Sequence, residues 1–233
     1  MISIIIPVYN MADRVERTLD SILKQSFRDL EVVVVDDGSS DHPENVIKKF
    51  AADYATAKIS LKFFKQTNKG APAARNYGMR ESQGEYLFFC DADIELIPDA
   101  FNIMRNTLIA NPSAAYAYPA FTFGNKLFRI WPFSAERLKA GPGINTMALV
   151  RRNAMPSGGW DKSIKKFQDW DLWLTLLENG HEGVWIDQVL YHAVSGGTMS
   201  VWLPAIAYKL LPFLPRVKKY NRALAIIKQK HQL

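Results

Sequence analysis

The sequence has 233 residues, of which 48% are hydrophobic and 22% are charged. This balance is that of a globular protein and excludes a disordered, collagen-like or coiled-coil chain, while the length predicts one large domain. A single cysteine, Cys90, excludes a disulfide framework and a cysteine-rich zinc site. The net charge of +6 fits an anionic ligand, an anionic membrane surface or nucleic acid, and does not choose among them.

No secretion signal or membrane span is expected. Residues 1–8 lack a basic region, and Pro7 interrupts their short apolar run. The longest later apolar stretch, 201–214, contains two prolines and Lys209 and is shorter than the ~20 residues that cross a bilayer. We therefore expect a soluble protein kept in a reducing compartment, most simply the cytoplasm.

The first hundred residues alternate between strand and helix patterns. Apolar runs at 2–8, 30–35, 59–64 and 85–90 predict strands, and the run at 2–8 suits a strand buried on both faces of a parallel sheet. A first helix is expected over 11–25, with Asn10 as its cap, and a second follows the turn at 36–40. A third is expected over 73–81, where Pro72 stands at the start, and a fourth begins at Pro98. This alternation predicts an α/β fold with a mainly parallel, Rossmann-like sheet flanked by helices.

The pattern is looser after residue 111. A strand is expected over 114–120, irregular structure over 121–143, a helix over 171–178 ended by Gly180, and a short strand over 183–186. The segment 202–230 reads as a basic amphipathic helix. Without a repeat or a low-complexity linker, we expect residues 1–233 to form one domain with an elaborated second half.

Polar clusters follow three of the expected strands: Tyr9 and Asn10, Asp36 and Asp37, and Asp91-Ala92-Asp93. Ligands of open α/β sheets bind beyond the carboxyl ends of the strands. Carboxylates can hold a diphosphate there only through a divalent cation. Each cluster alone has a structural alternative, since 36–39 suits a turn and Asp-x-Asp occurs by chance. Cys90 is expected to be a small buried residue, because no histidine lies near it in sequence.

These clusters, with the segments between them, resemble family 2 glycosyltransferases of the GT-A fold. The resemblance rests on Ile6-Pro7-Val8-Tyr9-Asn10, Val35-Asp36-Asp37-Gly38-Ser39, Asn68-Lys69-Gly70, Ala73-Ala74-Arg75-Asn76 with Gly78, Gly84-Glu85-Tyr86-Leu87, Asp91-Ala92-Asp93, Gly158-Gly159-Trp160-Asp161 and Gln168-Asp169-Trp170-Asp171-Leu172-Trp173-Leu174. It covers about residues 2–200 in the family's order. It implies a nucleotide-sugar-binding half at 1–110, an acceptor-side half at 111–200 and a basic helical tail at 201–233.

The resemblance also implies which residues bind the donor. The backbone of Pro7 and the side chains of Tyr9 and Asp37 would contact the nucleotide base and ribose. Asp91 and Asp93 would hold Mn²⁺ or Mg²⁺ on the diphosphate, with Asp93 the closer ligand. Three further residues would contact the donor: Lys69, which is otherwise a solvated turn residue, Arg75, and Ala92 between the two metal ligands.

Asp169 matches the family's catalytic base, which takes the proton of the attacking hydroxyl. The family usually has Glu-Asp here, whereas this chain has Gln168 before Asp169, so the first carboxylate is absent. The structural alternative is that Asp169 only caps the following helix, and Asp171 is expected to be a structural partner. His192 stands where the family often has arginine, so we expect an ordinary half-buried histidine and not a metal ligand.

Taken together, the sequence predicts a metal-dependent inverting glycosyltransferase of the hexosyltransferase class. It would move a sugar from a nucleoside-diphosphate sugar to a hydroxyl of a saccharide or lipid-linked saccharide, in cell-surface polysaccharide synthesis. The alternatives are a polyprenyl-phosphate glycosyltransferase and a noncatalytic nucleotide-sugar binder. An oxidoreductase is disfavoured because no Gly-x-Gly-x-x-Gly follows the first strand, and no nucleic-acid-binding module is present. The tail 201–233 either contacts the inner face of the membrane or packs on the core, and we favour packing.

Overall fold

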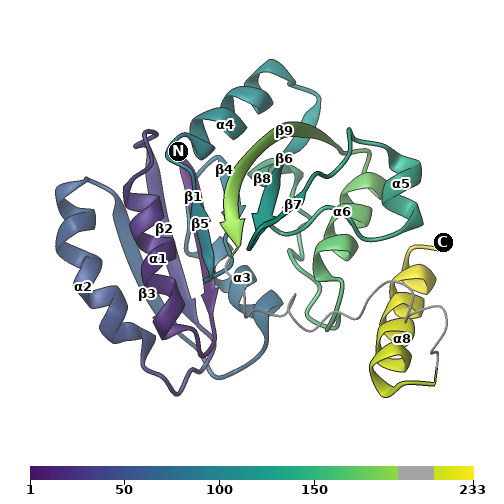
Figure 1. The fold of residues 1–233 in the computed structure, drawn as a ribbon, viewed down its shortest axis with the longest axis horizontal. Coiled ribbons are helices and arrows are strands. Elements are labelled where there is room, and N and C mark those ends of the chain that lie inside the picture. The colour runs from purple at the N-terminus through teal and green to yellow at the C-terminus, as the bar shows by residue number, and fades with distance from the viewer. Residues whose placement is uncertain (194–212) are drawn as a thin grey trace.

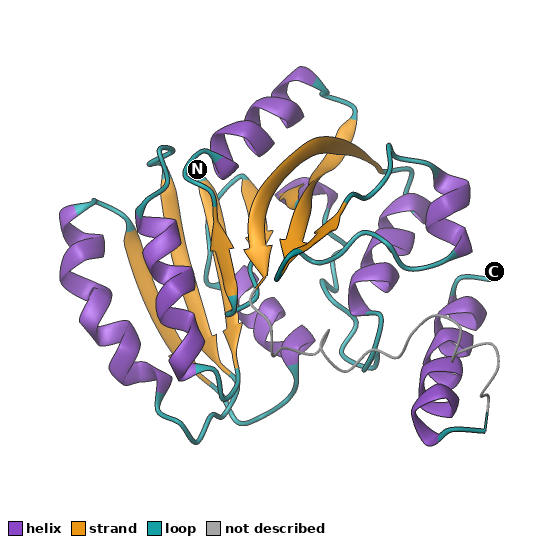
Figure 2. Ribbon diagram, in the orientation of Figure 1, coloured by secondary structure: helices purple, strands orange, loops and turns teal. Residues whose placement is uncertain are grey.

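The computed structural model describes residues 1–193 and 213–233. Within these ranges the strands form a nine-stranded sheet in the order β3-β2-β1-β4-β8-β6-β9-β5, with β7 paired to β6. Helices flank the sheet, and the last helix lies beside the second half of the chain (Figure 1, Figure 2). The α/β fold expected from the alternating pattern is confirmed.

The first half is a parallel sheet with helical crossovers. Its elements are β1 (Ile2–Val8), α1 (Ala12–Leu23), β2 (Leu30–Asp36), α2 (Pro43–Thr56), β3 (Ser60–Lys65), α3 (Ala71–Arg80), β4 (Tyr86–Phe89), β5 (Ile94–Leu96) and α4 (Ala100–Ala110). Strands β3, β2, β1 and β4 are parallel neighbours. Successive residues of β2 serve opposite faces: Val34 joins the main core with Leu19 and Ile47, whereas Val35 packs with Ala74 of α3. The apolar run of this strand is therefore explained by burial on both faces.

One expectation at the start of α1 is wrong. Asn10 does not cap this helix, because its backbone is left-handed (φ 51°) and its side-chain oxygen accepts the backbone N–H of Ser40. The N–H of Ala12, in the first turn, donates instead to the carboxylate of Asp41, at 2.8 Å. The cap thus comes from the loop after β2, which ties the carboxyl ends of β1 and β2 together.

The second half continues the same sheet with strands that pair in both directions. Its elements are β6 (Ala114–Phe123), β7 (Lys126–Phe128), α5 (Ala135–Ala140), β8 (Leu149–Arg151), a 3₁₀ turn (Arg152–Ala154), α6 (Gln168–Glu178) and β9 (Glu182–Ala193). Strand β8 pairs antiparallel to both β4 and β6 and so joins the two halves. Strand β9 runs parallel to β6 and antiparallel to β5. The segment 121–143 is therefore less irregular than expected, since it contains the end of β6, β7 and α5.

Helix α6 begins three residues earlier than the sequence pattern indicates. Phe167 precedes it with a left-handed backbone (φ 61°), so Asp169 lies inside the first turn and is not the residue that caps it. At the other end the expectation for Gly180 is confirmed: its φ is +80°, and the N–H of His181 donates to the carbonyl of Leu176.

The C-terminal helix is α8 (Pro215–Lys230). Val217 and Ile227 are fully buried, so α8 packs on the rest of the chain, as we favoured. The expected start of this helix at 202, with Leu203, Ile206, Leu210 and Leu211, lies outside the described residues. In the part of the chain that the structure describes, no helix has the length and apolar character that a membrane span needs.

Candidate active site

The three polar clusters meet at one edge of the sheet, as expected from the parallel strands. Val8 at the end of β1 lies opposite Asp36 at the end of β2, and the N–H of Asp37 donates to the carbonyl of Val8. The N–H of Asn10 donates to the hydroxyl of Ser39 at 3.0 Å. Strand β4 runs beside β1 and ends just before the third cluster, at 91–93. The sequence signal for a ligand site at this edge is therefore matched by the topology.

Asp37 is buried and holds the loop after β3. Its carboxylate accepts the side-chain amide of Gln66 at 2.7 Å and the backbone N–H groups of Lys69 and Gly70, both at 2.8 Å. The Asn68 backbone passes so close to Gly38 that a Cβ there would lie 2.8 Å from its nitrogen. Asp37 thus fixes the loop 66–70, whereas the side chain of Lys69 itself is exposed.

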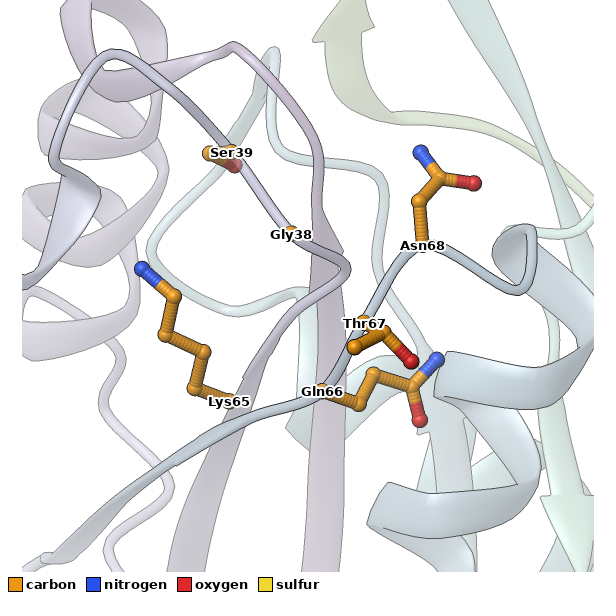
Figure 3. Close-up of a pocket in the computed structure, with 6 residues that line it drawn as sticks. All are labelled: Gly38, Ser39, Lys65, Gln66, Thr67 and Asn68. Carbon is orange, nitrogen blue, oxygen red and sulfur yellow. The ribbon is translucent and has the colours of Figure 1, made fainter.

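A cavity of about 490 Å³ lies between the turn after β2 and this loop (Figure 3). Lys65 beside it pairs with the buried Asp36, with Nζ 3.2 Å from Oδ2. Pro7 is partly buried in β1, and Tyr9 just beyond it is 51% exposed. The cavity is lined by polar groups and backbone: Gly38, Ser39, Lys65, Gln66, Thr67 and Asn68.

Asp91 and Asp93 form the acidic pair after β4. Burial raises the pKa of the Asp93 carboxyl, the charge of Asp91 raises it further, and Arg14, 3.8 Å away, acts in the opposite direction. Ala92 between them is buried. Two carboxylates that repel each other offer the oxygen ligands that Mn²⁺ or Mg²⁺ prefers, so the pair fits a divalent cation. Among the described residues no cluster of three His, Cys, Asp or Glu side chains forms at this pair.

Arg75 on α3 connects the acidic pair to α6. Its guanidinium donates to Asp91 at 3.2 Å and to the side-chain oxygen of Gln168 at 3.0 Å. It is buried and stacks on the ring of Trp160, at 4.6 Å from the centroid. A neutral Gln168 accepts one of these bonds without cancelling the positive charge of Arg75. The positive charge of Arg75 is paired with Asp91 and not with Gln168.

The next residue of α3, Asn76, secures the loop 158–160. Its side-chain amide donates to the carbonyl of Trp160 and its oxygen accepts the N–H of Trp160, both at 2.8 Å. Gly159 has φ +66°, and a Cβ there would lie 2.3 Å from the Asn76 oxygen, so only glycine fits. We call the contacts of Arg75 and Asn76 with Trp160 and Gln168 the α3 seam.

Asp169 lies half-buried in the first turn of α6. Burial raises the pKa of its carboxyl, the N–H of Trp170 and the charge of Arg75 oppose this, and the charge of Asp91 adds to it. These influences place the carboxyl near both Arg75 and Asp91. A carboxyl with a raised pKa beside the acidic edge can accept a proton from a bound hydroxyl.

The neighbours of Asp169 anchor the helix. The indole N–H of Trp170 donates to the carbonyl of Leu138 and that of Trp173 to the carbonyl of Ile144. Asp171 is buried and faces the C-terminal helix, where Lys230 and His231 contact its carboxylate. The expectation that Asp171 is a structural partner is met, but its two partners carry no local signal in the sequence, since they follow it by about sixty residues.

His192 is exposed and not half-buried as expected. It lies near the end of β9, opposite Glu95 in register, and its Nδ1 is 2.6 Å from the hydroxyl of Thr122. Cys90 is buried, as expected, and burial raises the pKa of its thiol.

A parallel sheet with an acidic pair at one strand end, faced by a carboxylate from a helix of the second half, is the architecture of the GT-A glycosyltransferases. Glycosyl transferase family 2 matches residues 3–168, and the chain belongs to this family. The resemblance inferred from the motifs is thus confirmed.

The relatives are longer proteins. An uncharacterized glycosyltransferase of Haemophilus influenzae is 29% identical over 191 residues, which cover 76% of this chain and 62% of that protein. The chondroitin synthase of Escherichia coli is 30% identical over 188 residues, which cover 77% of this chain and 27% of the synthase. The chain therefore spans less than two thirds of the length of either relative.

Solved structures share the fold. S. aureus TarS in complex with UDP-GlcNAc superposes with a TM-score of 0.71 at 20% identity, over 91% of this chain and 64% of that one. The mannosyltransferase PcManGT from Pyrobaculum calidifontis, in complex with GDP-Man and Mn²⁺, gives a TM-score of 0.68 at 23% identity, over 83% and 56% of the two chains.

Proposed function

We propose that this chain is an inverting glycosyltransferase. It moves a sugar from a nucleoside-diphosphate sugar to a hydroxyl of a saccharide or lipid-linked saccharide, in the synthesis of a surface polysaccharide. The convergence of Asp91, Arg75 and Asp169 at the carboxyl edge of the sheet carries the proposal. Membership of family 2 and the similarity to a chondroitin synthase support it.

The donor lies along the edge formed by β1, β2 and β4. The backbone of Pro7 and the side chains of Tyr9 and Asp37 contact the base and ribose, and the nearby cavity of about 490 Å³ supplies the space. Asp37 also holds the loop 66–70 beside this cavity. The diphosphate lies toward Lys69, Arg75 and Ala92. The TarS and PcManGT structures hold UDP-GlcNAc and GDP-Man, so these two classes of donor are the first to test.

Asp91 and Asp93 hold a divalent cation on the diphosphate. A bound cation offsets the negative charge that develops on the departing nucleoside diphosphate. Burial and then the charge of Asp91 raise the pKa of Asp93, and a cation bound between the two carboxylates would offset their repulsion. PcManGT, a protein of the same fold, was crystallised with Mn²⁺.

Asp169 acts on the acceptor. Its carboxylate takes the proton of the acceptor hydroxyl while that oxygen forms a bond to the anomeric carbon of the sugar. The bond from this carbon to the diphosphate breaks on the opposite side, and the nucleoside diphosphate leaves with the electron pair. Arg75 lies between Asp91 and Gln168, where its charge favours the ionised form of Asp169.

The proposed organisation is one domain with a donor half at 1–110, an acceptor half at 111–200 and a tail at 201–233. We place the protein in the cytoplasm, with the outer side of α8 against the inner face of the membrane. Phe213 and Ile226 are exposed there, and residues 213–233 contain no acidic residue. The cations on this helix that support the contact are Arg216, Lys218, Lys219 and Arg222.

The test is titration of the protein with UDP and GDP, with and without Mn²⁺, followed by a panel of UDP- and GDP-sugars. One nucleotide class should bind more tightly with Mn²⁺, and Asp93→Ala should remove this gain while Asp53→Ala, on the exposed side of α2, keeps it. Equal affinity with and without Mn²⁺ would reject the metal site. Binding without hydrolysis or transfer from any donor would favour the noncatalytic binder.

A further inference from the structure

The C-terminal end of α8 contacts α6 through charged side chains, of which Asp171 and His231 are buried. The carboxylate of Asp171, a residue only 3% exposed, lies 2.7 Å from Nζ of Lys230 and 2.9 Å from Nε2 of His231. Lys230 also reaches Asp161 at 2.8 Å, and Nδ1 of His231 lies 2.7 Å from Glu178. We call these five residues the α8 clamp.

The clamp holds the two helices in one arrangement. Both ring nitrogens of His231 lie within hydrogen-bond distance of carboxylate oxygens, Nδ1 of Glu178 and Nε2 of Asp171. A buried carboxylate left without a partner is strongly destabilising. Asp171 is therefore satisfied only while α8 is docked.

The clamp lies on the side of α6 opposite to the proposed base. Residues two apart on an α-helix differ by about 200° around its axis, so Asp169 and Asp171 project in nearly opposite directions. Asp169 lies toward Arg75 and Asp91, while Asp171 lies toward α8. The first turn of α6 is thus held from both sides, by the α3 seam and by the α8 clamp.

The rest of α6 has other anchors. The indoles of Trp170 and Trp173 fix the helix to Leu138 and Ile144 in the acceptor half. Phe167, just before the helix, meets Tyr220 of α8 edge-on, with ring centroids 5.1 Å apart. Within the described residues, the clamp is what pairs the charge of Asp171 on the outward side of the first turn.

We propose that Lys230 and His231 are positioning residues for sugar transfer. Through Asp171 they hold the first turn of α6, and with it Asp169, at the place where the acceptor hydroxyl loses its proton. The inference rests on the proposed function, in which Asp169 is the base. It makes the docked C-terminal helix a requirement of the acceptor step and not of donor binding, because the clamp residues all lie outside the donor half.

The experiment compares Lys230→Met, His231→Gln and their combination with Lys228→Met, which removes a partly exposed cation of the same helix outside the clamp. Three quantities are measured: amide hydrogen exchange of residues 168–174, nucleotide affinity by titration, and single-turnover transfer. In the combined variant we expect exchange to rise and transfer to fall by about ten- to a hundredfold, the range for loss of a hydrogen bond to a charged group. Nucleotide affinity should stay within about twofold of the wild type, and Lys228→Met should change none of the three.

A conservative variant separates positioning from a general loss of structure. Lys230→Arg can still bond two carboxylates and should restore most of the transfer that Lys230→Met loses. If the combined variant does not fold, Asp171→Asn, which keeps the size of the side chain, takes its place with the same expected results.

Three results would overturn the inference: unchanged exchange at 168–174, raised exchange with unchanged transfer, or transfer lost together with nucleotide affinity. A wild-type chain that transfers no sugar would instead reject the proposed function. The exchange measurement would still show, independently of activity, whether α8 fixes the first turn of α6.

Discussion

Three aspartates of the candidate site have the same side chain but different surroundings, and we assign them different roles: Asp37, Asp93 and Asp169. Asp37 accepts three hydrogen bonds from one loop, so it acts as a structural anchor. Asp93 is half-desolvated beside Asp91, and burial raises its pKa, which suits a cation ligand. Burial also raises the pKa of Asp169, but Arg75 lies near it, which suits a group that cycles between its ionised and protonated forms.

Asp169→Asn should separate binding from chemistry. Asparagine can still accept the N–H of Trp170 but takes no proton at neutral pH, so nucleotide and metal affinity should stay nearly unchanged. Transfer should fall by about 10²–10⁴-fold, the usual contribution of a general base. Single-turnover transfer beside a nucleotide titration is the measurement. A variant that transfers like the wild type would return Asp161 or Asp171 to consideration.

Asp37→Ala should weaken nucleotide binding by about ten- to a hundredfold, with or without metal. The structure supplies a reason that the motif alone does not: the alanine leaves Gln66, Lys69 and Gly70 without their acceptor, so the loop loses its shape. Titration in the presence of Mn²⁺ and of a chelator checks this, with hydrogen exchange at 66–70 as a second readout. A loss confined to the metal-containing titration would contradict the assignment.

At the scale of elements, the pair between Asp161 and Lys230 links the loop before α6 to α8. Hydrogen bonds from Lys230 and from Ser163 lower the pKa of Asp161 to about 2. A carboxyl whose pKa is lowered by folding stabilises the native state above its unfolded pKa of about 3.9, and this stabilisation is lost as the pH falls toward 2.

Asp161→Asn should therefore lower the free energy of unfolding at pH 7 by at most about 1 kcal/mol, since the pair is about one third exposed. The difference from the wild type should shrink between about pH 4 and pH 2. Urea unfolding at a series of pH values measures it. Asp53→Asn, at an exposed position of α2, is the matched control, and an equal pH dependence in both variants would refute the pairing.

Elements whose burial is visible as an apolar pattern in the sequence could be predicted. Elements that form through contacts with residues distant in the sequence could not. Strands β1, β2 and β4 are apolar because both of their faces are covered, and this pattern is visible in the sequence, whereas β3 at the edge of the sheet is only partly buried. Strand β5 was not predicted from the sequence, because it has only three residues and forms by pairing with β9, almost a hundred positions later. The early start of α6 depends on the left-handed backbone of Phe167, for which no local signal exists.

The same division holds for the site. The residue types at the strand ends could be read from motifs, because parallel strands deliver their ends to one edge. The contact of Arg75 with Gln168 joins residues 93 positions apart, and the clamp joins Asp171 to residues 59 and 60 positions away. Such contacts depend on how the two halves pack against each other, and the hydrophobic periodicity within either half does not predict this packing.

At the scale of the whole molecule, Arg75 is the group on which both halves converge. Arg75→Met should remove its bonds to Asp91 and Gln168 and leave two partly buried acceptors without their donor. We expect both nucleotide affinity and transfer to fall by about tenfold or more, in contrast to Asp169→Asn. Arg75→Lys should restore little, because an ammonium lacks the fork that bonds two acceptors at once. Titration and single-turnover transfer of both variants are the check, and a loss of transfer alone would contradict this role.

The α3 seam also limits how this protein can be recombined with its relatives. In a chimera whose acceptor half comes from another family member, Arg75 and Asn76 of the donor half meet new partners. The two halves would pack as in this protein only if the introduced half has glycine at position 159 and a hydrogen-bond acceptor at position 168. The backbone at position 160 must also be placed so that it can bond the side chain of Asn76. Acceptor specificity can therefore be transferred between these enzymes only when the residues at positions 75 and 76 and those at 159, 160 and 168 come from compatible parents.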